Sequence, residues 1–182
     1  MSQPSARKRS VGVVVCAYYF DRARLSGLRR WTQPLHTPNM NPTTEKTIQQ
    51  LGYGGLVPFV LLTALIWLVR ADLTPFLALA LSAYGAVIAS FLGGIHWGVG
   101  FKAGGEVPRF HFVWGVLPSL VAWVALMMPP FAGLPLLGLL LVACYVVDKR
   151  TYPAVGLGPW LPMRLRLTVV ATLSCVLGAA AV

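Results

Sequence analysis

The chain has 182 residues, of which 57% are hydrophobic and only 11% are charged. Soluble domains average about 25% charged residues, so a water-soluble fold of this composition would expose large apolar patches. The formal net charge of +10 lies mostly in the first 30 residues and at the ends of apolar runs, which is typical of membrane topology signals and disfavours a nucleic-acid-binding protein.

Five apolar segments approach the roughly 20 residues that a helix needs to cross a bilayer core of about 30 Å. They lie at residues 51–69, 75–101, 110–128, 131–147 and 165–182. No strand-like alternation competes with the helical interpretation. The sequence therefore predicts an all-α integral membrane bundle of five transmembrane helices over residues 48–182, after a basic tail over 1–47 that we expect to be disordered.

The short loops between these segments predict the orientation, because Lys and Arg collect on the cytoplasmic side. Lys46, Lys102, Arg109 and the basic residues of 149–166 fall on one side, whereas Arg70 stands alone on the other. The N-terminus is thus expected inside and the C-terminus outside. The membrane is expected to be a bacterial inner membrane or, in a eukaryote, the mitochondrial inner membrane.

The first 39 residues leave several interpretations open. Residues 7–20 imitate a signal peptide, but Asp21 and Arg22 follow at once without a clear cleavage site. An Arg-rich, acid-poor tail is also typical of a mitochondrial presequence. Met40 is a second candidate start, so the sequence alone does not say whether this part is translated or cleaved.

The second segment carries small residues at every fourth position. Small side chains let another helix approach closely, which drives association in lipid. The expected packing row consists of Ser82, Ala86, Ser90, Gly94 and Gly98, with Gly85, Ala89 and Gly93 as a second row. We therefore expect this helix at the centre of the bundle.

His96 extends the second of these rows and should face the protein interior near the cytoplasmic end. An ionisable side chain within a membrane is a functional candidate by default. Three roles stay open: a structural hydrogen bond, proton or ligand handling, and ligation of a metal or haem. His111 could face His96, but it is expected at the membrane interface, and no metal or cofactor is predicted.

Two prolines, Pro58 and Pro118, should kink the first and third helices and free the carbonyls of Gly54 and Trp114. Together with nearby polar side chains, these kinks could form a small cavity open to the cytoplasm. The candidate functional polar residues are His96, Trp97, Tyr145, Thr168 and Thr172. The alternatives are that the kinks only shape packing and that Trp97 is an interfacial anchor.

The connection between the fourth and fifth segments contains a candidate interfacial charge cluster. Asp148 should end the fourth helix and pair with Arg164 or Arg166 at the start of the fifth. The basic excess should also contact anionic lipid headgroups, and a substrate-anion site is the alternative. No metalloprotease, serine hydrolase or phosphate-loop motif occurs, so no catalytic residue is predicted and the protein is not expected to be an enzyme.

The stretches GGIHWG and PWLPMRLRLT, with Pro118 and Asp148 between them, resemble the transmembrane protein 69 family over residues 48–180. The resemblance implies a small inner-membrane protein without an assigned activity. Our leading expectation is a non-enzymatic accessory or assembly factor that binds a membrane-protein partner or a second copy of itself. A small permease or channel subunit is the alternative, and a haem-binding or enzymatic protein is third.

Overall fold

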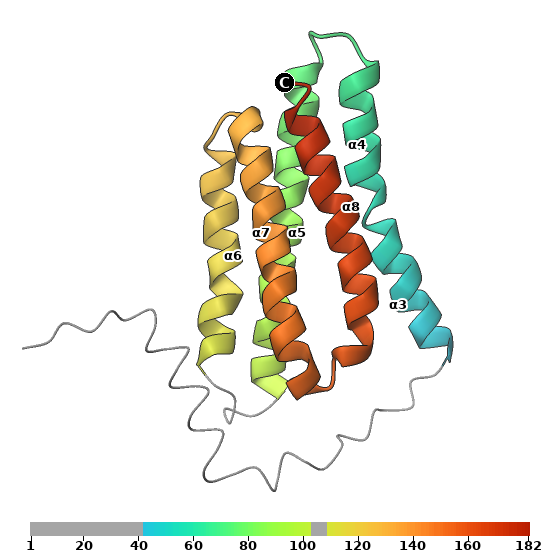
Figure 1. Ribbon diagram of the computed structural model, residues 1–182, viewed down its shortest axis with the longest axis vertical. Coiled ribbons are helices and arrows are strands. Elements are labelled where there is room, and N and C mark those ends of the chain that lie inside the picture. Colours follow the sequence, from blue (N-terminus) through green and yellow to red (C-terminus); the bar gives the residue numbers. More distant parts are fainter. Residues whose placement is uncertain (1–41, 103–108) are drawn as a thin grey trace, which may run out of the picture. The chain divides into compact units, whose positions relative to one another are not determined.

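The computed structural model describes residues 42–102 and 109–182, and over these residues the chain is all-α. Figure 1 shows the helices running side by side. They are α3 (Pro42–Gly54), α4 (Val57–Leu68), α5 (Thr74–Lys102), α6 (Phe110–Leu126), α7 (Pro130–Thr151) and α8 (Leu161–Ala179), with short 3-10 turns η1 (Tyr152–Val155) and η2 (Gly158–Trp160). Because α3 and α4 form one interrupted segment, the prediction of five helical segments is confirmed.

Among the described residues, four segments are long and apolar enough to span a membrane: Pro42–Leu68, Thr74–Lys102, Pro130–Val155 and Gly158–Ala179. Helix α6 is shorter, with 17 residues, or about 26 Å at a rise of 1.5 Å per residue. Helix α7 has 22 residues and extends beyond the predicted range 131–147 at both ends.

Several helix ends differ from the predicted bounds. The first helix begins at Pro42 rather than 51, so it includes residues 42–47 that we assigned to the tail. Asp148 lies inside α7, which continues to Thr151, rather than at its end. Apolar composition marks the length of a helix that lies within the bilayer. The backbone hydrogen bonds of the helix continue into polar residues beyond that length. The alternatives for residues 1–39 lie outside the described residues.

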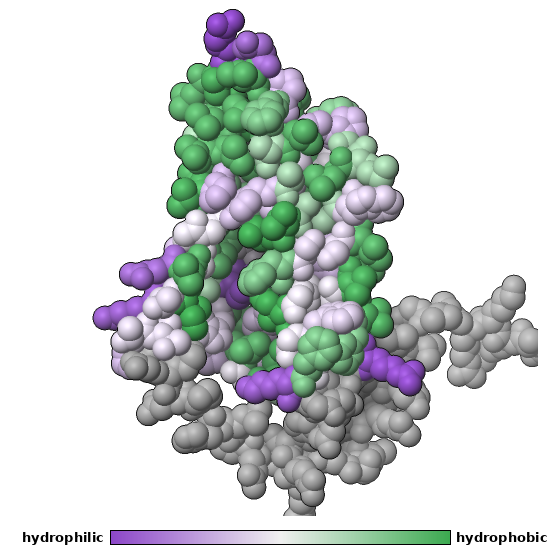
Figure 2. All heavy atoms as spheres, turned by 180° about the vertical axis from the view of Figure 1, so that it is seen from behind, coloured by the Kyte–Doolittle hydropathy of each residue, from purple (hydrophilic) through white to green (hydrophobic). Residues whose placement is uncertain are grey.

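Helix α5 is the centre of the bundle, as predicted, and packs against α4, α6, α7 and α8. The core around it is apolar and contains the fully buried side chains Phe59, Leu81, Leu134, Leu137 and Leu141. Figure 2 shows hydrophobic side chains over the middle of the visible face and hydrophilic ones near its two ends. This distribution fits a bundle whose outer surface faces lipid.

The second predicted row of small residues packs along its whole length, whereas the first packs only at its start, where Ser82 and Ala86 are buried. Gly85, Ala89 and Gly93 are buried, and a Cβ atom at Gly93 would overlap the carbonyl oxygen of Gly115 in α6. By contrast, Gly94 and Gly98 are exposed, with no atom within 4 Å of an added Cβ. A step of four residues rotates by about 40° beyond a full turn, so a row of such steps leaves the buried face.

The two prolines act differently. Pro58 lies in the first turn of α4, just after the break at Gly55 and Leu56. The hydroxyl of Tyr84 donates to the carbonyl of Gly55 at 2.7 Å, one residue later than the carbonyl we expected to be freed. Pro118 is buried inside α6, which continues through it.

Candidate functional site: a buried histidine, aspartate and arginine cluster

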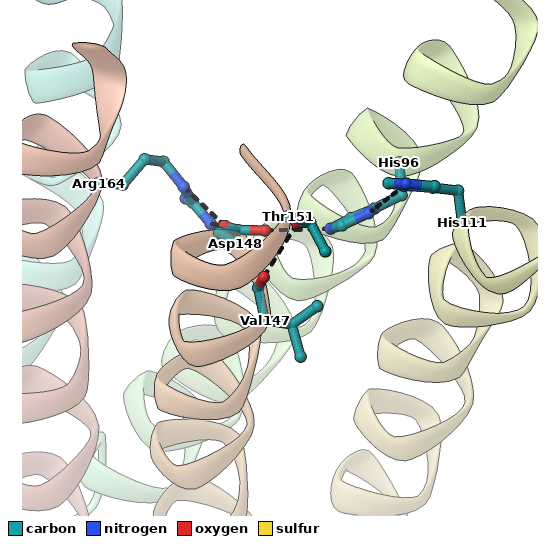
Figure 3. Close-up of polar contacts among 6 residues, drawn as sticks. All are labelled: His96, His111, Val147, Asp148, Thr151 and Arg164. Carbon is teal, nitrogen blue, oxygen red and sulfur yellow. Dashed lines mark hydrogen bonds and ion pairs between the residues drawn. The ribbon is translucent and has the colours of Figure 1, made fainter. Parts of the chain in front are cut away.

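Four helices each contribute one ionisable side chain to a single line of contacts (Figure 3). His96 comes from α5, His111 from α6, Asp148 from α7 and Arg164 from α8. His96 Nδ1 lies 3.0 Å from His111 Nδ1, and His96 Nε2 lies 3.1 Å from Asp148 Oδ1. Arg164 Nε donates to Asp148 Oδ2 at 3.1 Å, and Arg164 Nη2 donates to the same oxygen. We call these four residues the ion cluster.

All members of the ion cluster are buried. The exposed fraction is 2% for His96, 1% for Asp148, 7% for His111 and 8% for Arg164. A buried charge is tolerated when a counter-charge and hydrogen bonds compensate its lost hydration. Here Asp148 accepts from a guanidinium through one oxygen and contacts an imidazole through the other. Over the described residues, no buried side-chain nitrogen or oxygen lacks a hydrogen-bond partner.

Local sequence explains why these side chains point inward. In α7, Asp148 continues the buried positions Leu137, Leu141 and Cys144 at steps of three or four residues, which share one helix face. In α5, His96 follows Gly93 by three residues, and both are buried. The missing side chain at Gly93 lets α6 approach closely enough for His111 to reach His96.

The cluster lies at one end of the bundle, which we call the basic end. Exposed basic residues at this end are Lys46, Lys102, Arg109, Lys149, Arg150 and Arg166. His96 is six residues before Lys102, which corresponds to about 9 Å along the helix. The opposite end carries Arg70 and Asp72, which form an exposed ion pair at 3.5 Å.

Comparison with known proteins decides the family. The sequence model of the DUF3429 family, described as a protein of unknown function, matches residues 44–180. The chain belongs to this family. It is also 35% identical over 134 residues to transmembrane protein 69 of Xenopus tropicalis, an alignment that covers 69% of this chain and 51% of that protein. The chain therefore spans about half the length of this relative.

The family match takes in every helix that contributes to the ion cluster. It agrees with the resemblance drawn from the sequence, and this DUF3429 chain is a multi-span membrane protein. No solved structure matches the chain. The family description names no reaction.

The structure does not gather all the predicted polar residues around His96. Trp97 is exposed, and its Nε1 donates to the carbonyl of Phe112 at 3.0 Å. Thr172 donates to the carbonyl of Gly138 at 3.3 Å. Thr168 is buried one turn after Arg164, and Tyr145 is half-buried three residues before Asp148. Trp97 and Thr172 thus bond to backbone carbonyls of neighbouring helices rather than to members of the ion cluster.

Arg166 also lies outside the ion cluster, so the predicted charge cluster is corrected. Its side chain is exposed, and Nη1 donates to the hydroxyl of Tyr53 at 3.3 Å, which links α8 to α3. Arg164 alone of the two arginines pairs with Asp148. The pair is buried rather than interfacial, because Asp148 lies one turn inside α7 instead of at its end.

The sequence suggested that His111 could face His96 but placed it at the membrane interface. In the structure His111 is buried against His96, with ring centroids 5.3 Å apart. One residue of the site, Tyr152, was not predicted. Tyr152, in η1, is buried, and its ring centroid lies 6.3 Å from that of His96. No local sequence pattern distinguishes Tyr152 from an interfacial tyrosine.

The two Nδ1 atoms of His96 and His111 lie 3.0 Å apart, which is hydrogen-bond distance. Among the residues that the structure describes, no group of three or more His, Cys, Asp or Glu could hold a metal ion.

Proposed function

We propose that this chain is a five-span inner-membrane protein with its N-terminus inside and its C-terminus outside. The asymmetry of charge supports the orientation: exposed Lys and Arg side chains gather at the basic end, whereas Arg70 at the opposite end is paired with Asp72. By the distribution of Lys and Arg in membrane proteins, the basic end faces the cytoplasm or the mitochondrial matrix. Anionic lipid headgroups are the expected contacts of these basic side chains.

Helix α6 counts as the fifth span in this proposal, although it is short. It packs along α5, and its outer side is apolar and exposed, with Val113, Leu117, Leu120 and Trp123. Such a surface is stable against lipid and costly against water. A helix of 17 residues is at the lower limit for crossing a bilayer.

A reporter fused after Val182 tests this topology. We expect a periplasmic reporter, such as alkaline phosphatase, to be active there when the chain is produced in bacteria. The matched control is the same reporter fused after Lys102, at the basic end of α5, where it should be inactive. Activity with the reverse pattern would contradict the orientation, and activity at both or neither position would contradict the five-span arrangement.

We propose further that the protein handles protons at the ion cluster, as a small permease or channel subunit and not as an enzyme. The observation that carries this proposal is the continuous line from Arg164 through Asp148 and His96 to His111. Ionisable chains of this kind inside membranes are characteristic of proton relays. Histidine is suited to the task because its ordinary pKa is about 6.5, near physiological pH.

A purely structural role explains the line less well. Replacing a buried ion pair by well-packed apolar residues is often neutral or stabilising, so packing alone does not require four ionisable groups. The cluster also sits close to the aqueous phase at the basic end, where protons are available. These features move the permease hypothesis ahead of the accessory-factor hypothesis that the sequence favoured.

His96→Ala tests the proposal in reconstituted vesicles. With a pH gradient and a membrane potential imposed, proton flux measured with an entrapped dye should fall to the level of protein-free vesicles. Ser90→Ala is the matched control, because Ser90 lies on the same helix and donates only to the carbonyl of Ala86 in its own helix. Its flux should equal that of the unchanged protein.

The amount of folded protein in the membrane separates the possible outcomes of this test. If His96→Ala accumulates normally and its flux is unchanged, the cluster does not handle protons. If the variant fails to accumulate, His96 is required for folding, and His111→Asn then takes its place in the same flux measurement. Normal accumulation with lost flux supports the proposal.

A non-enzymatic accessory role is the second candidate. The observation in its favour is the exposed pair Gly94 and Gly98 on α5, where an added Cβ would meet no atom within 4 Å. Two glycines four residues apart let a further transmembrane helix approach closely, from a partner protein or from a second copy. Crosslinking in native membranes followed by mass spectrometry tests this role, and a chain that remains monomeric and uncrosslinked would contradict it.

A further inference from the structure

The contacts in the ion cluster determine which nitrogen of each histidine carries a proton. Asp148 is paired with Arg164 and therefore ionised, and a carboxylate only accepts hydrogen bonds. His96 Nε2 must then donate to Asp148 Oδ1, and in a neutral imidazole the other nitrogen becomes an acceptor. His111 Nδ1 must in turn donate to His96 Nδ1. Within the described residues, the one nitrogen of the line left with a lone pair and no described partner is His111 Nε2.

The described charged and titratable groups that face the two histidines come from α7, α8 and η1. Asp148 and Arg164 cancel each other's charge, and Tyr152 packs beside His96. The line in this form is neutral overall. Over the described residues, the basic nitrogen without a described partner belongs to His111, the second residue of α6 at the basic end.

We propose that the His96 and His111 pair is a one-proton relay that exchanges with the aqueous phase at the basic end. A proton binds His111 Nε2, and the proton on His111 Nδ1 passes along the 3.0 Å contact to His96 Nδ1. One N–H bond forms on each histidine and one breaks on His111. The added charge thus comes to rest on His96, next to the Asp148 carboxylate, while His111 is neutral with its proton on Nε2.

The structure also indicates that the relay opens to one side. Beyond His96 toward the opposite end, the core consists of apolar side chains such as Phe59, Leu81 and Leu134. The buried hydroxyls described there belong to Thr63, Ser82, Thr168 and Ser174, and those of Thr63 and Ser82 donate to backbone carbonyls. Such groups do not hold a proton charge in this conformation, so transport across the membrane requires a second one. The relay rests on the proposed handling of protons, which it makes specific.

Nitrogen NMR of the protein in lipid vesicles tests the relay directly. The chain has three histidines, so ¹⁵N-histidine labelling of a His36→Asn variant leaves only the ring signals of His96 and His111. The further substitution His111→Asn then shows which signals belong to His96. At alkaline pH we expect His96 protonated at Nε2 only and His111 at Nδ1 only. On acidification, His96 should become protonated at both nitrogens, and the proton of His111 should move from Nδ1 to Nε2.

Two results would overturn the relay: a doubly protonated His111 beside a neutral His96, or no change of either ring between alkaline and acidic pH. The side of access is tested in sealed vesicles of known orientation, where acidifying the basic-end side alone should produce the change. A change produced by acidifying the opposite side would contradict access from the basic end alone.

The flux measurement tests the permease proposal, and the NMR measurement tests the relay separately. Proton exchange in the expected order without flux would leave the relay and remove the permease proposal. Proton flux without the expected order of protonation would support the permease proposal and remove the relay.

Discussion

Replacing Asp148 with asparagine should destabilise the protein by about 3–5 kcal/mol, the range observed when one partner of a buried ion pair is removed. The substitution keeps the size of the side chain but leaves the guanidinium of Arg164 buried without its counter-charge. It also replaces the carboxylate that accepts a hydrogen bond from His96 Nε2 with a neutral amide. The measurement is reversible unfolding in a single detergent, or thermal loss of monomer when unfolding is irreversible.

The double variant Asp148→Asn with Arg164→Gln is the matched control for this prediction. It removes both charges and retains side chains that hydrogen-bond to each other, so the loss of stability should be smaller than for Asp148→Asn alone. If the double variant is at least as unstable as the single one, the unpaired charge of Arg164 is not the cause. The interpretation of the pair as mutually compensating charges would then be wrong.

Gly93→Ala should destabilise the bundle, whereas Gly94→Ala should not. A Cβ atom at Gly93 would overlap the backbone oxygen of Gly115, and a backbone atom cannot move aside as a flexible side chain can. Forcing an extra carbon into a packed contact costs about 1–3 kcal/mol. The two helices would separate, and the contact between His96 and His111 would lengthen with them.

Gly94→Ala provides the control because the same atom is added one residue later, where nothing lies within 4 Å. Alanine is also the better helix former, so this variant should be at least as stable as the unchanged protein. Both variants are compared by thermal unfolding under identical conditions. Equal destabilisation by the two would contradict the close approach of α5 and α6 at Gly93, and destabilisation by Gly94→Ala alone would indicate that a partner covers this surface.

Much of the architecture could be predicted because it depends on features close together in the chain. The apolar runs predict the helices, and the Lys and Arg content of the loops predicts an orientation that has yet to be measured. The three-residue step from Gly93 to His96 correctly predicts that His96 is buried. The nearness of Asp148 and Arg164 in sequence likewise led to their pairing, which the structure contains.

Helix ends and the choice of packing row were harder to predict. The row from Ser82 to Gly98 looked continuous in the sequence, yet Gly94 and Gly98 are exposed. A helix has 3.6 residues per turn, so four-residue spacing alone does not say where a row leaves the contact. The position of the neighbouring helix determines this, because it selects which glycine meets the backbone of Gly115.

By itself, the sequence determined the membrane class, the helices and the inward direction of His96, since composition and helical periodicity are local properties. Tertiary structure alone decided that His96 lies between His111 and Asp148, which are 15 and 52 residues away in the chain. Those contacts depend on how far α5, α6 and α7 approach one another and on the rotation of each about its axis. In lipid, the fit of small residues such as Gly93 and Gly115 sets that approach, and it is known only once all the helices are packed together.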